Sequence, residues 1–155
     1  MGKIYNIVLN SGYGTTNGDV RNITFFYDLN RLENCRYKLN FTFLTSTFTT
    51  TNTTVCNIFT DLCQTNCFFA TNPNNTNLYS TSYNYQYLGL ALPTGLGVSQ
   101  NLYAPANLNG EIILETRPMN NLFSIYLLNN DTGKTAYSST SLPSTYTLNI
   151  CLEEI

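Results

Sequence analysis

The triplet Gly133-Lys134-Thr135 is the first candidate for chemistry, because many phosphate-binding loops end with it. A Walker A loop also has a glycine five residues before its Gly-Lys pair, and a following helix whose N-terminus favours phosphate. This chain has Leu128 at that position, and the residues AYSSTSLPS that follow have strand and turn character. The stretch from Asn130 to Gly133 therefore predicts a hairpin loop between two strands.

Three glycines near the start, Gly12, Gly14 and Gly18, resemble a dinucleotide-binding fingerprint. Their spacing is G-x-G-x-x-x-G, and the segment that follows, VRNITFFYDL, predicts a strand where the fingerprint requires a helix. We interpret these glycines as part of a loop between two strands.

Histidine is absent from the chain. This excludes Ser-His and Cys-His nucleophile pairs and any His-ligated metal. The nine Asp and Glu residues leave a catalytic carboxylate pair of the glycosidase type formally possible. Glu111 and Glu115 lie four apart in a predicted strand and share one face, which an exposed strand face explains. We expect no enzymatic activity, no catalytic residues, no cofactor and no metal.

The five cysteines form an odd set in a chain without a secretory signal, which argues against a disulfide framework. Cys63 and Cys67 have a spacing compatible with a zinc pair, and Cys35 and Cys56 could complete four thiolates. These positions lack the two compact knuckles of a zinc ribbon or finger. We therefore expect the cysteines, Cys151 included, to be buried free thiols.

Tyrosines are the candidate binding residues. Tyr83, Tyr85 and Tyr87 alternate in phase, so we expect them to share one face of a strand. They could stack on sugar rings or on a partner protein, because tyrosine presents a rigid apolar ring with a polar tip. Packing in the core or on the sheet surface explains the three positions equally well.

The charged fraction is low, at 10% against about 25% in a typical globular protein. A weakly charged surface has little self-repulsion, which favours close packing against neighbours. An AT-rich genome would also enrich Asn, Tyr, Ile and Phe codons. The net charge is -2 and the seven Lys and Arg are scattered singly, so the sequence predicts no nucleic-acid binding.

The opening residues MGKIYNIVLN contain no uninterrupted apolar stretch of the signal-peptide type. No apolar run approaches the roughly 20 residues that span a bilayer. We expect a soluble protein that is made in the cytosol.

Alternation of apolar and polar residues is the dominant pattern. It is clearest in RYKLNFTFLT (36–45) and TYTLNICLEEI (145–155), where it predicts half-buried strands. The apolar sets are Tyr37, Leu39, Phe41 and Phe43 in the first strand and Tyr146, Leu148, Ile150 and Leu152 in the second; Lys38, Asn40, Thr42, Thr147, Asn149, Cys151 and Glu153 face the other way. Further strands are expected in 3–10, 20–29, 53–62, 78–92, 111–118, 122–129 and 135–140.

No window has a sustained helical period, so helix should be limited to a turn or two near residues 28–35 or 104–109. Many short strands without helices for parallel crossovers must be antiparallel and must bury two inner faces against each other. We expect one antiparallel β-sandwich domain over residues 1–155. About eight strands over this length favour a single jelly roll, with an immunoglobulin-like sandwich as the alternative.

Four phrases of the sequence carry a resemblance to a known kind of protein: YNIVLNS, TFFYDLNRLENCRYKLNFTFLT, ETRPMNNLFSIYLLNND and YTLNICLEEI. The chain resembles, over nearly its whole length, small β-sandwich structural proteins of large DNA viruses of algae and other protists, and of their virophage and polinton-like relatives. The resemblance implies a jelly-roll-like minor capsid or cement protein of the virion, which assembles with itself and with major capsid proteins in the host cytoplasm. It carries over no functional residues.

The resulting hypothesis is a virion structural protein that binds through weakly charged strand faces and a loop from Leu92 to Asn109. The alternative is a carbohydrate-binding module or host-attachment protein that uses the three tyrosines to stack on a glycan.

Overall fold

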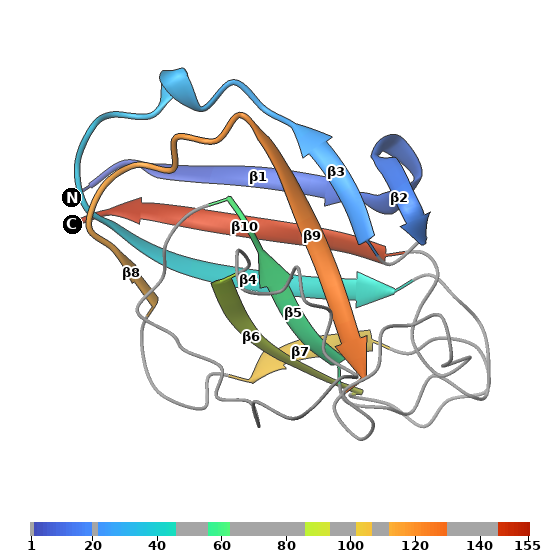
Figure 1. The fold of residues 1–155 in the computed structure, drawn as a ribbon. Coiled ribbons are helices and arrows are strands. Elements are labelled where there is room, and N and C mark those ends of the chain that lie inside the picture. The colour runs from blue at the N-terminus through green and yellow to red at the C-terminus, as the bar shows by residue number, and fades with distance from the viewer. Residues whose placement is uncertain are drawn as a thin grey trace, which may run out of the picture.

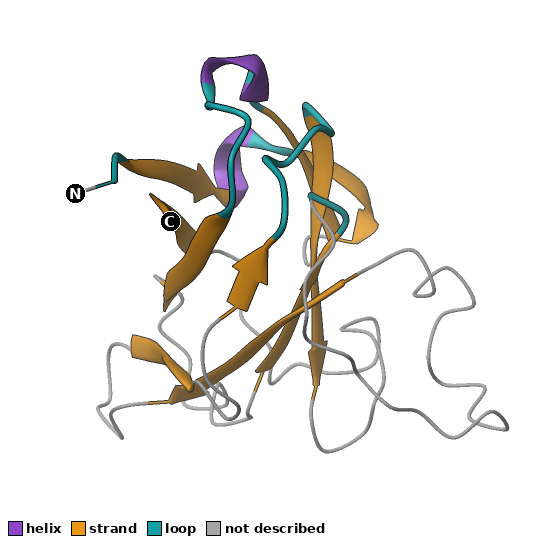
Figure 2. Ribbon diagram, turned by 90° about the vertical axis from the view of Figure 1, so that its left-hand side faces the viewer, coloured by secondary structure: helices purple, strands orange, loops and turns teal. Residues whose placement is uncertain are grey.

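The computed structural model describes residues 2–19, 22–45, 56–62, 86–93, 102–106, 112–129 and 146–155. Within these ranges the chain forms ten strands and two short 3-10 helices, η1 (Ser11–Tyr13) and η2 (Leu29–Arg31), and no α-helix (Figure 2). The strands are β1 (Ile4–Asn10), β2 (Thr15–Asp19), β3 (Asn22–Phe26), β4 (Tyr37–Thr45), β5 (Cys56–Thr60), β6 (Gln86–Pro93), β7 (Leu102–Ala106), β8 (Ile112–Leu114), β9 (Leu122–Asn129) and β10 (Tyr146–Glu154).

Hydrogen bonds join the strands in the order β1-β10-β4-β7-β6-β5-β9-β3-β2, and β8 pairs with β4 beside this path. Every pair is antiparallel. The path folds over, so that the layer with β1, β10 and β4 lies against the layer with β5, β9 and β3 (Figure 1). The predicted fold class, an antiparallel β-sandwich, is confirmed at this level.

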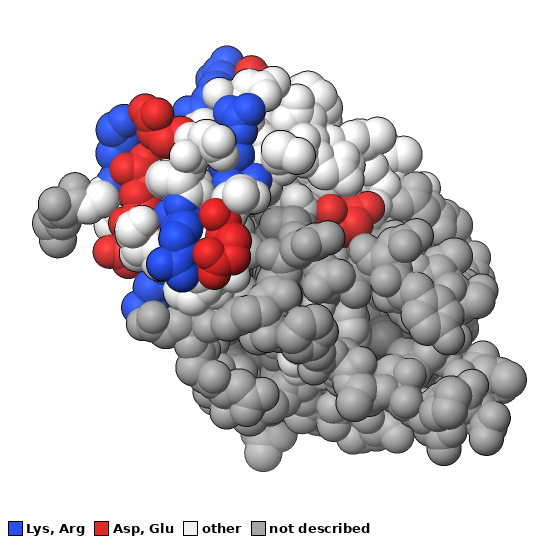
Figure 3. Space-filling model, turned by 60° about the vertical axis from the view of Figure 1, so that its left-hand side comes forward, with Lys and Arg blue, Asp and Glu red and all other residues white. Residues whose placement is uncertain are grey.

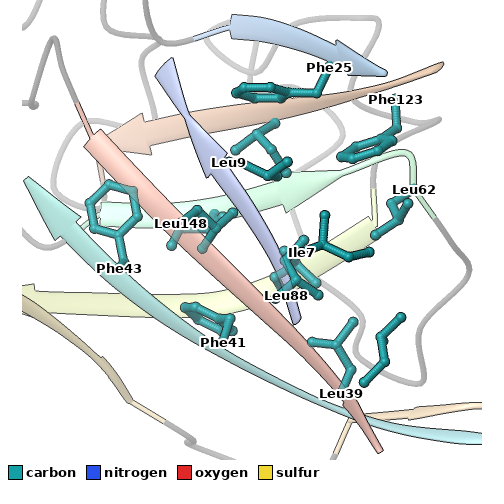
Figure 4. Close-up of a cluster of buried hydrophobic side chains, with 14 of the residues drawn as sticks. Ile7, Leu9, Phe25, Leu39, Phe41, Phe43, Leu62, Leu88, Phe123 and Leu148 are labelled. Atoms are coloured by element: carbon teal, nitrogen blue, oxygen red, sulfur yellow. The ribbon is translucent and has the colours of Figure 1, made fainter. Parts of the chain in front are cut away.

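The core lies between the two layers and is built by the predicted alternation. The apolar sets of β4 and β10 are all buried, as expected, and their alternate residues are half-buried or exposed. Figure 4 shows side chains from both layers meeting, with Ile7 and Leu9 of β1 on one side and Phe25 and Phe123 on the other. Burial of these apolar faces is the main force that holds the layers together.

Aromatic pairs connect neighbouring strands inside this core. The rings of Phe43 in β4 and Tyr146 in β10 stack with centroids 5.2 Å apart, at an interplanar angle of 28°. In the opposite layer, Phe25 and Phe123 are register partners on β3 and β9, with centroids 6.3 Å apart. Such contacts stabilise strand pairs beyond their burial alone.

Two strands were not expected. Residues Thr15–Asp19 form β2 where the sequence predicts a loop, and Leu102–Ala106 form β7 inside the predicted loop from Leu92 to Asn109. Neither segment alternates, and each contains a strand breaker, so pairing with a neighbour determines its conformation. Pro105, which has no N–H to donate, lies beyond the two residues of β7 that pair with β4 and is the register partner of Ala91 in β6.

The helix and strand lengths also differ in places from expectation. η2 confirms a helical turn within 28–35, where the Asp28 side chain accepts a hydrogen bond from the Asn30 N–H at 3.3 Å. The predicted helical turn at residues 104–109 is wrong for residues 104–106, which belong to strand β7. The predicted strand 111–118 is reduced to Ile112–Leu114. The predicted strand at 135–140 lies outside the described residues.

Candidate functional site

The predicted tyrosine surface is described only at Tyr87. Tyr83 and Tyr85 lie outside the described residues. The Tyr87 ring packs on Phe59 with centroids 5.2 Å apart, and its hydroxyl donates to Asn57 Oδ1 at 3.2 Å. A role for the three tyrosines in binding stays a prediction.

Tyr87 belongs to a row of aromatic residues that crosses three strands. Phe59 of β5 is the register partner of Tyr87 in β6 and of Tyr126 in β9. The row lies on the face of these strands that points away from the main core, and forms a separate apolar cluster. A register shift in β6, where Gly89 has a φ of 145°, keeps Tyr87 in line with Phe59. Tyr87 therefore has a packing role in addition to any role in binding.

The other sequence candidates give no reactive cluster in the described residues. Glu115 lies just after β8, which ends at Leu114, so it is not part of the strand in which the sequence placed it. Its Oε2 pairs with Arg36 Nε at 3.0 Å. Glu111, Cys63, Cys67 and the triplet 133–135 lie outside the described residues.

Two of the five cysteines can be compared with the expectation of buried free thiols. Cys35 and Cys151 are free, but both are half-buried. Cys151 is half-buried because it lies on the outward face of β10, where alternation places the residues between Ile150 and Leu152.

The most distinctive surface is the outward face of the layer formed by β1, β10 and β4. Register pairing places twelve side chains on it in four rows. The row Ile4–Glu153–Lys38, at one end, carries two charged residues, whereas the nine side chains of the other three rows are all uncharged. We call these nine residues the uncharged face. Its rows are Asn6–Cys151–Asn40, Val8–Asn149–Thr42 and Asn10–Thr147–Leu44.

Short polar side chains hold the uncharged face in place. Asn10 Nδ2 donates to Thr147 Oγ1, and Asn149 Nδ2 donates to Asn6 Oδ1, each at 3.3 Å. Asn149 Oδ1 is buried and accepts no hydrogen bond within the part of the chain that the structure describes. Val8, in contrast, is 66% exposed in the middle of the β1 edge.

Charged residues gather at one end of the molecule, where the first and last strands begin and end (Figure 3). The Lys3 ammonium pairs with Glu33 at 2.9 Å, which raises the pKa of Lys3. Glu154 Oε2 accepts a hydrogen bond from the Lys3 backbone N–H at 3.0 Å, and Oε1 accepts one from the Tyr5 hydroxyl at 2.9 Å. The backbone hydrogen bond is the main cause that lowers the pKa of Glu154. The charge is thus concentrated beside the uncharged face and not on it.

We expect Glu154→Gln to lower thermal stability near neutral pH and to reduce the loss of stability in acid. Because the folded-state pKa of Glu154 is lowered, its ionised form stabilises the fold above the unfolded value of about 4.3. That contribution is lost as the pH falls through the folded-state pKa. Melting temperatures at about pH 7 and about pH 3 measure both effects. Glu153→Gln, one residue earlier on the outward face, is the control, and equal pH profiles for the two variants would contradict the prediction.

An exposed apolar patch lies where β3 ends and β9 begins. Phe26 and Leu122 are register partners and are 72% and 60% exposed. Met119, in the segment that leads into β9, is also exposed. Exposed large apolar pairs are typical of surfaces that contact another protein.

No protein-family model matches the chain, and neither a search of curated proteins nor a search of solved structures found a match. Among the described residues, no helix has the length and apolar character needed to cross a membrane. The same residues contain no group of three or more Cys, Asp or Glu that could hold a metal ion.

The uncharged face was partly visible in the sequence. Alternation already placed Asn40, Thr42, Thr147, Asn149 and Cys151 on the outward faces of two strands. It could not reveal that β10 lies between β1 and β4, which brings these residues side by side. Strand neighbours depend on contacts distant in sequence, which local patterns do not encode.

Proposed function

We propose that the protein is a virion structural protein, a minor capsid or cement component that packs against copies of itself and against major capsid proteins after synthesis in the host cytoplasm. The uncharged face is the observation that carries this proposal. Bringing two such faces together requires no desolvation of charged groups, which is the largest penalty in burying a surface.

We also propose that the sandwich is a single jelly roll. In a jelly roll, a long antiparallel ribbon is wound around a core. The first strand of the ribbon therefore pairs with the last, and each further pair lies inside the previous one along the sequence, down to the hairpin that closes the ribbon. The pairs β5–β6, β4–β7, β3–β9 and β1–β10 nest in this way. An immunoglobulin-like sandwich has sheets with strands A, B, E, D and C, F, G, so its first strand neighbours the second. The pairing of the first strand with the last supports the jelly roll over this alternative.

A shell component must contact neighbours in more than one direction. The uncharged face and the patch at Phe26 and Leu122 belong to different layers of the sandwich, since β1, β10 and β4 form one and β3 and β9 belong to the other. Two separate surfaces of low charge therefore support packing between neighbours on both sides.

Mass spectrometry of purified particles tests the proposed function. Particles from cells infected with a virus that encodes this chain are purified on a density gradient and treated to remove loosely attached protein. The chain is expected at a fixed ratio to the major capsid protein. Its absence from such particles, together with a monomeric state at high concentration, would overturn the proposal.

Phe26→Ser with Leu122→Asn is expected to reduce incorporation into particles several-fold while lowering the melting temperature by no more than a few degrees. Both side chains are mostly exposed, so polar replacements cost the isolated fold less than about 0.5 kcal/mol each. The chain-to-capsid ratio in particles is the readout. Tyr13→Ser, at another highly exposed position, is the matched control. Equal loss of incorporation in the control would remove the patch from the proposed contacts.

A further inference from the structure

The outer edge of β1 is open in the part of the sheet that the structure describes, because β1 is the last strand of the path. The Glu154 N–H donates to the Lys3 carbonyl at 3.0 Å, which fixes the alternation along the pair. The backbone groups of Tyr5, Ile7 and Leu9 therefore point toward β10. Those of residues 4, 6 and 8 point away from it.

This edge lacks the usual protection against pairing with another strand. Natural edges are blunted by bulges, by proline or by charged side chains. β1 is regular over seven residues and contains no charge, proline or register shift. The other end of the sheet differs, since β2 has a register shift between Thr16 and Asp19 and ends in a carboxylate residue.

We propose that β1 pairs antiparallel with β1 of a second copy of this chain, about a two-fold axis that passes beside Asn6. This inference deepens the proposed function, on whose self-packing it rests, by identifying one contact between copies, along the β1 edge beside the uncharged face. In this register residue 6 faces its own copy, and Ile4 faces Val8 of the second copy. All three positions have outward-pointing backbone groups, so each pair can exchange two hydrogen bonds.

The side chains are complementary in the same register. Ile4 and Val8 are 55% and 66% exposed, and the two-fold axis brings them together twice as cross-strand apolar pairs. The pairing also joins the two outward faces across six strands, with the uncharged row Asn6–Cys151–Asn40 of one copy running into the same row of the other. The charged ends, with Lys3 and Glu154, then lie at opposite ends of the joined strands. A parallel arrangement would instead place Lys3 beside its own copy.

The area of the contact sets the expected strength. One pair of seven-residue strands buries less than the roughly 1,200 Å² of a stable interface. The dimer should therefore depend on concentration in solution and gain strength where many copies are held together, as in a shell.

Disulfide trapping in the full chain tests the register. Residues that face each other as a hydrogen-bonded pair have Cα atoms about 5.5 Å apart, within the range of a disulfide. Asn6→Cys is made in a chain that also carries Cys151→Ser, because Cys151 faces position 6 across the β1–β10 pair and could form an intramolecular disulfide with it. This variant is expected to give a covalent dimer on mild oxidation, and peptide mapping should place the new disulfide at position 6. Val8→Cys alone should not link to itself, whereas a mixture of Ile4→Cys and Val8→Cys chains should form a mixed disulfide. Thr42→Cys, on the same face but on β4, is the control.

Introducing a charge at the contact provides an independent readout. Asn6→Lys places two ammonium groups beside the two-fold axis and is expected to weaken self-association roughly tenfold in sedimentation equilibrium. Thr42→Lys adds the same charge to the same face and should leave association unchanged.

Each outcome of these experiments decides the inference. No disulfide at position 6, equal trapping at position 42, or equal weakening by the two lysine variants would overturn it. If the chain is found in purified particles but its Asn6→Cys variant forms no disulfide at position 6, the β1 contact is overturned and the proposed function stands. If the variant forms the disulfide but the chain is missing from particles, the β1 contact stands and the proposed function is overturned.

Discussion

Phe43→Ala is expected to lower the free energy of unfolding by about 3–5 kcal/mol, the range for removing a buried aromatic side chain. Phe43 is 1% exposed and lies in the core (Figure 4). Its ring stacks on Tyr146 at the junction of β4 and β10. The substitution leaves a cavity and removes the ring contact between two central strands. A domain of this size is stable by only about 5–15 kcal/mol, so the variant should be largely unfolded under mild denaturant. Urea titration followed by circular dichroism measures the change.

The next residue along the strand is the control for this variant. Leu44 is 49% exposed and belongs to the uncharged face, so Leu44→Ala should cost less than about 1 kcal/mol. Similar losses in the two variants would mean that the inward and outward faces of β4 are wrongly assigned.

Gly14→Ala is expected to lower the free energy of unfolding by about 1–3 kcal/mol through overpacking. A Cβ atom at this position would overlap Ile23 Cγ2, and it would lie 2.9 Å from Phe25 Cε1 and 3.0 Å from the Thr24 carbonyl. The backbone at the start of β2 therefore lies directly on β3, and only glycine fits between them. Thermal unfolding monitored by calorimetry provides the measurement.

Gly12→Ala is the matched substitution two residues earlier. Among the residues that the structure describes, its added Cβ would contact only the Asn10 side chain, at 3.2 Å, and Gly12 is exposed. The N–H that donates to Asn10 Oδ1 is retained in alanine. A loss in Gly12→Ala as large as that in Gly14→Ala would contradict the close approach of β2 to β3. The glycines of this segment thus allow tight packing of strands in the structure, in keeping with the rejection of a dinucleotide-binding loop.

Alternation in the sequence was sufficient to predict which side chains of β4 and β10 are buried. Tyr37 and Leu152, near the same end of these paired strands, are both fully buried, and the residues beside them are not. This works because a period of two assigns each residue to a face without reference to the neighbouring strand. The sandwich followed from the same pattern, since two apolar faces must cover each other.

The sequence could not predict which strands are neighbours. β2 and β7 have no alternating pattern, and their conformation depends on pairing with strands already in place. The uncharged face depends even more on pairing, because Val8, Asn149 and Thr42 are far apart in sequence and meet only through two registers. The tyrosine prediction was incomplete for a related reason: the packing of Tyr87 on Phe59 depends on a shift in the β5–β6 register.

The central position of β10 has a consequence for the order of folding. β10 lies between β1 and β4, so these two strands cannot be joined in one layer before β10 is made. Ile4 of β1 and Lys38 of β4 are both register partners of Glu153 in β10. During synthesis, both earlier strands are released from the ribosome long before residues 146–154 appear. Contacts this distant in sequence form slowly. One layer of the sandwich therefore stays open until the last strand is made, and its apolar faces are exposed to other chains in the meantime. Completion of β10 is what commits a nascent chain to its own fold instead of to a premature contact with a neighbour.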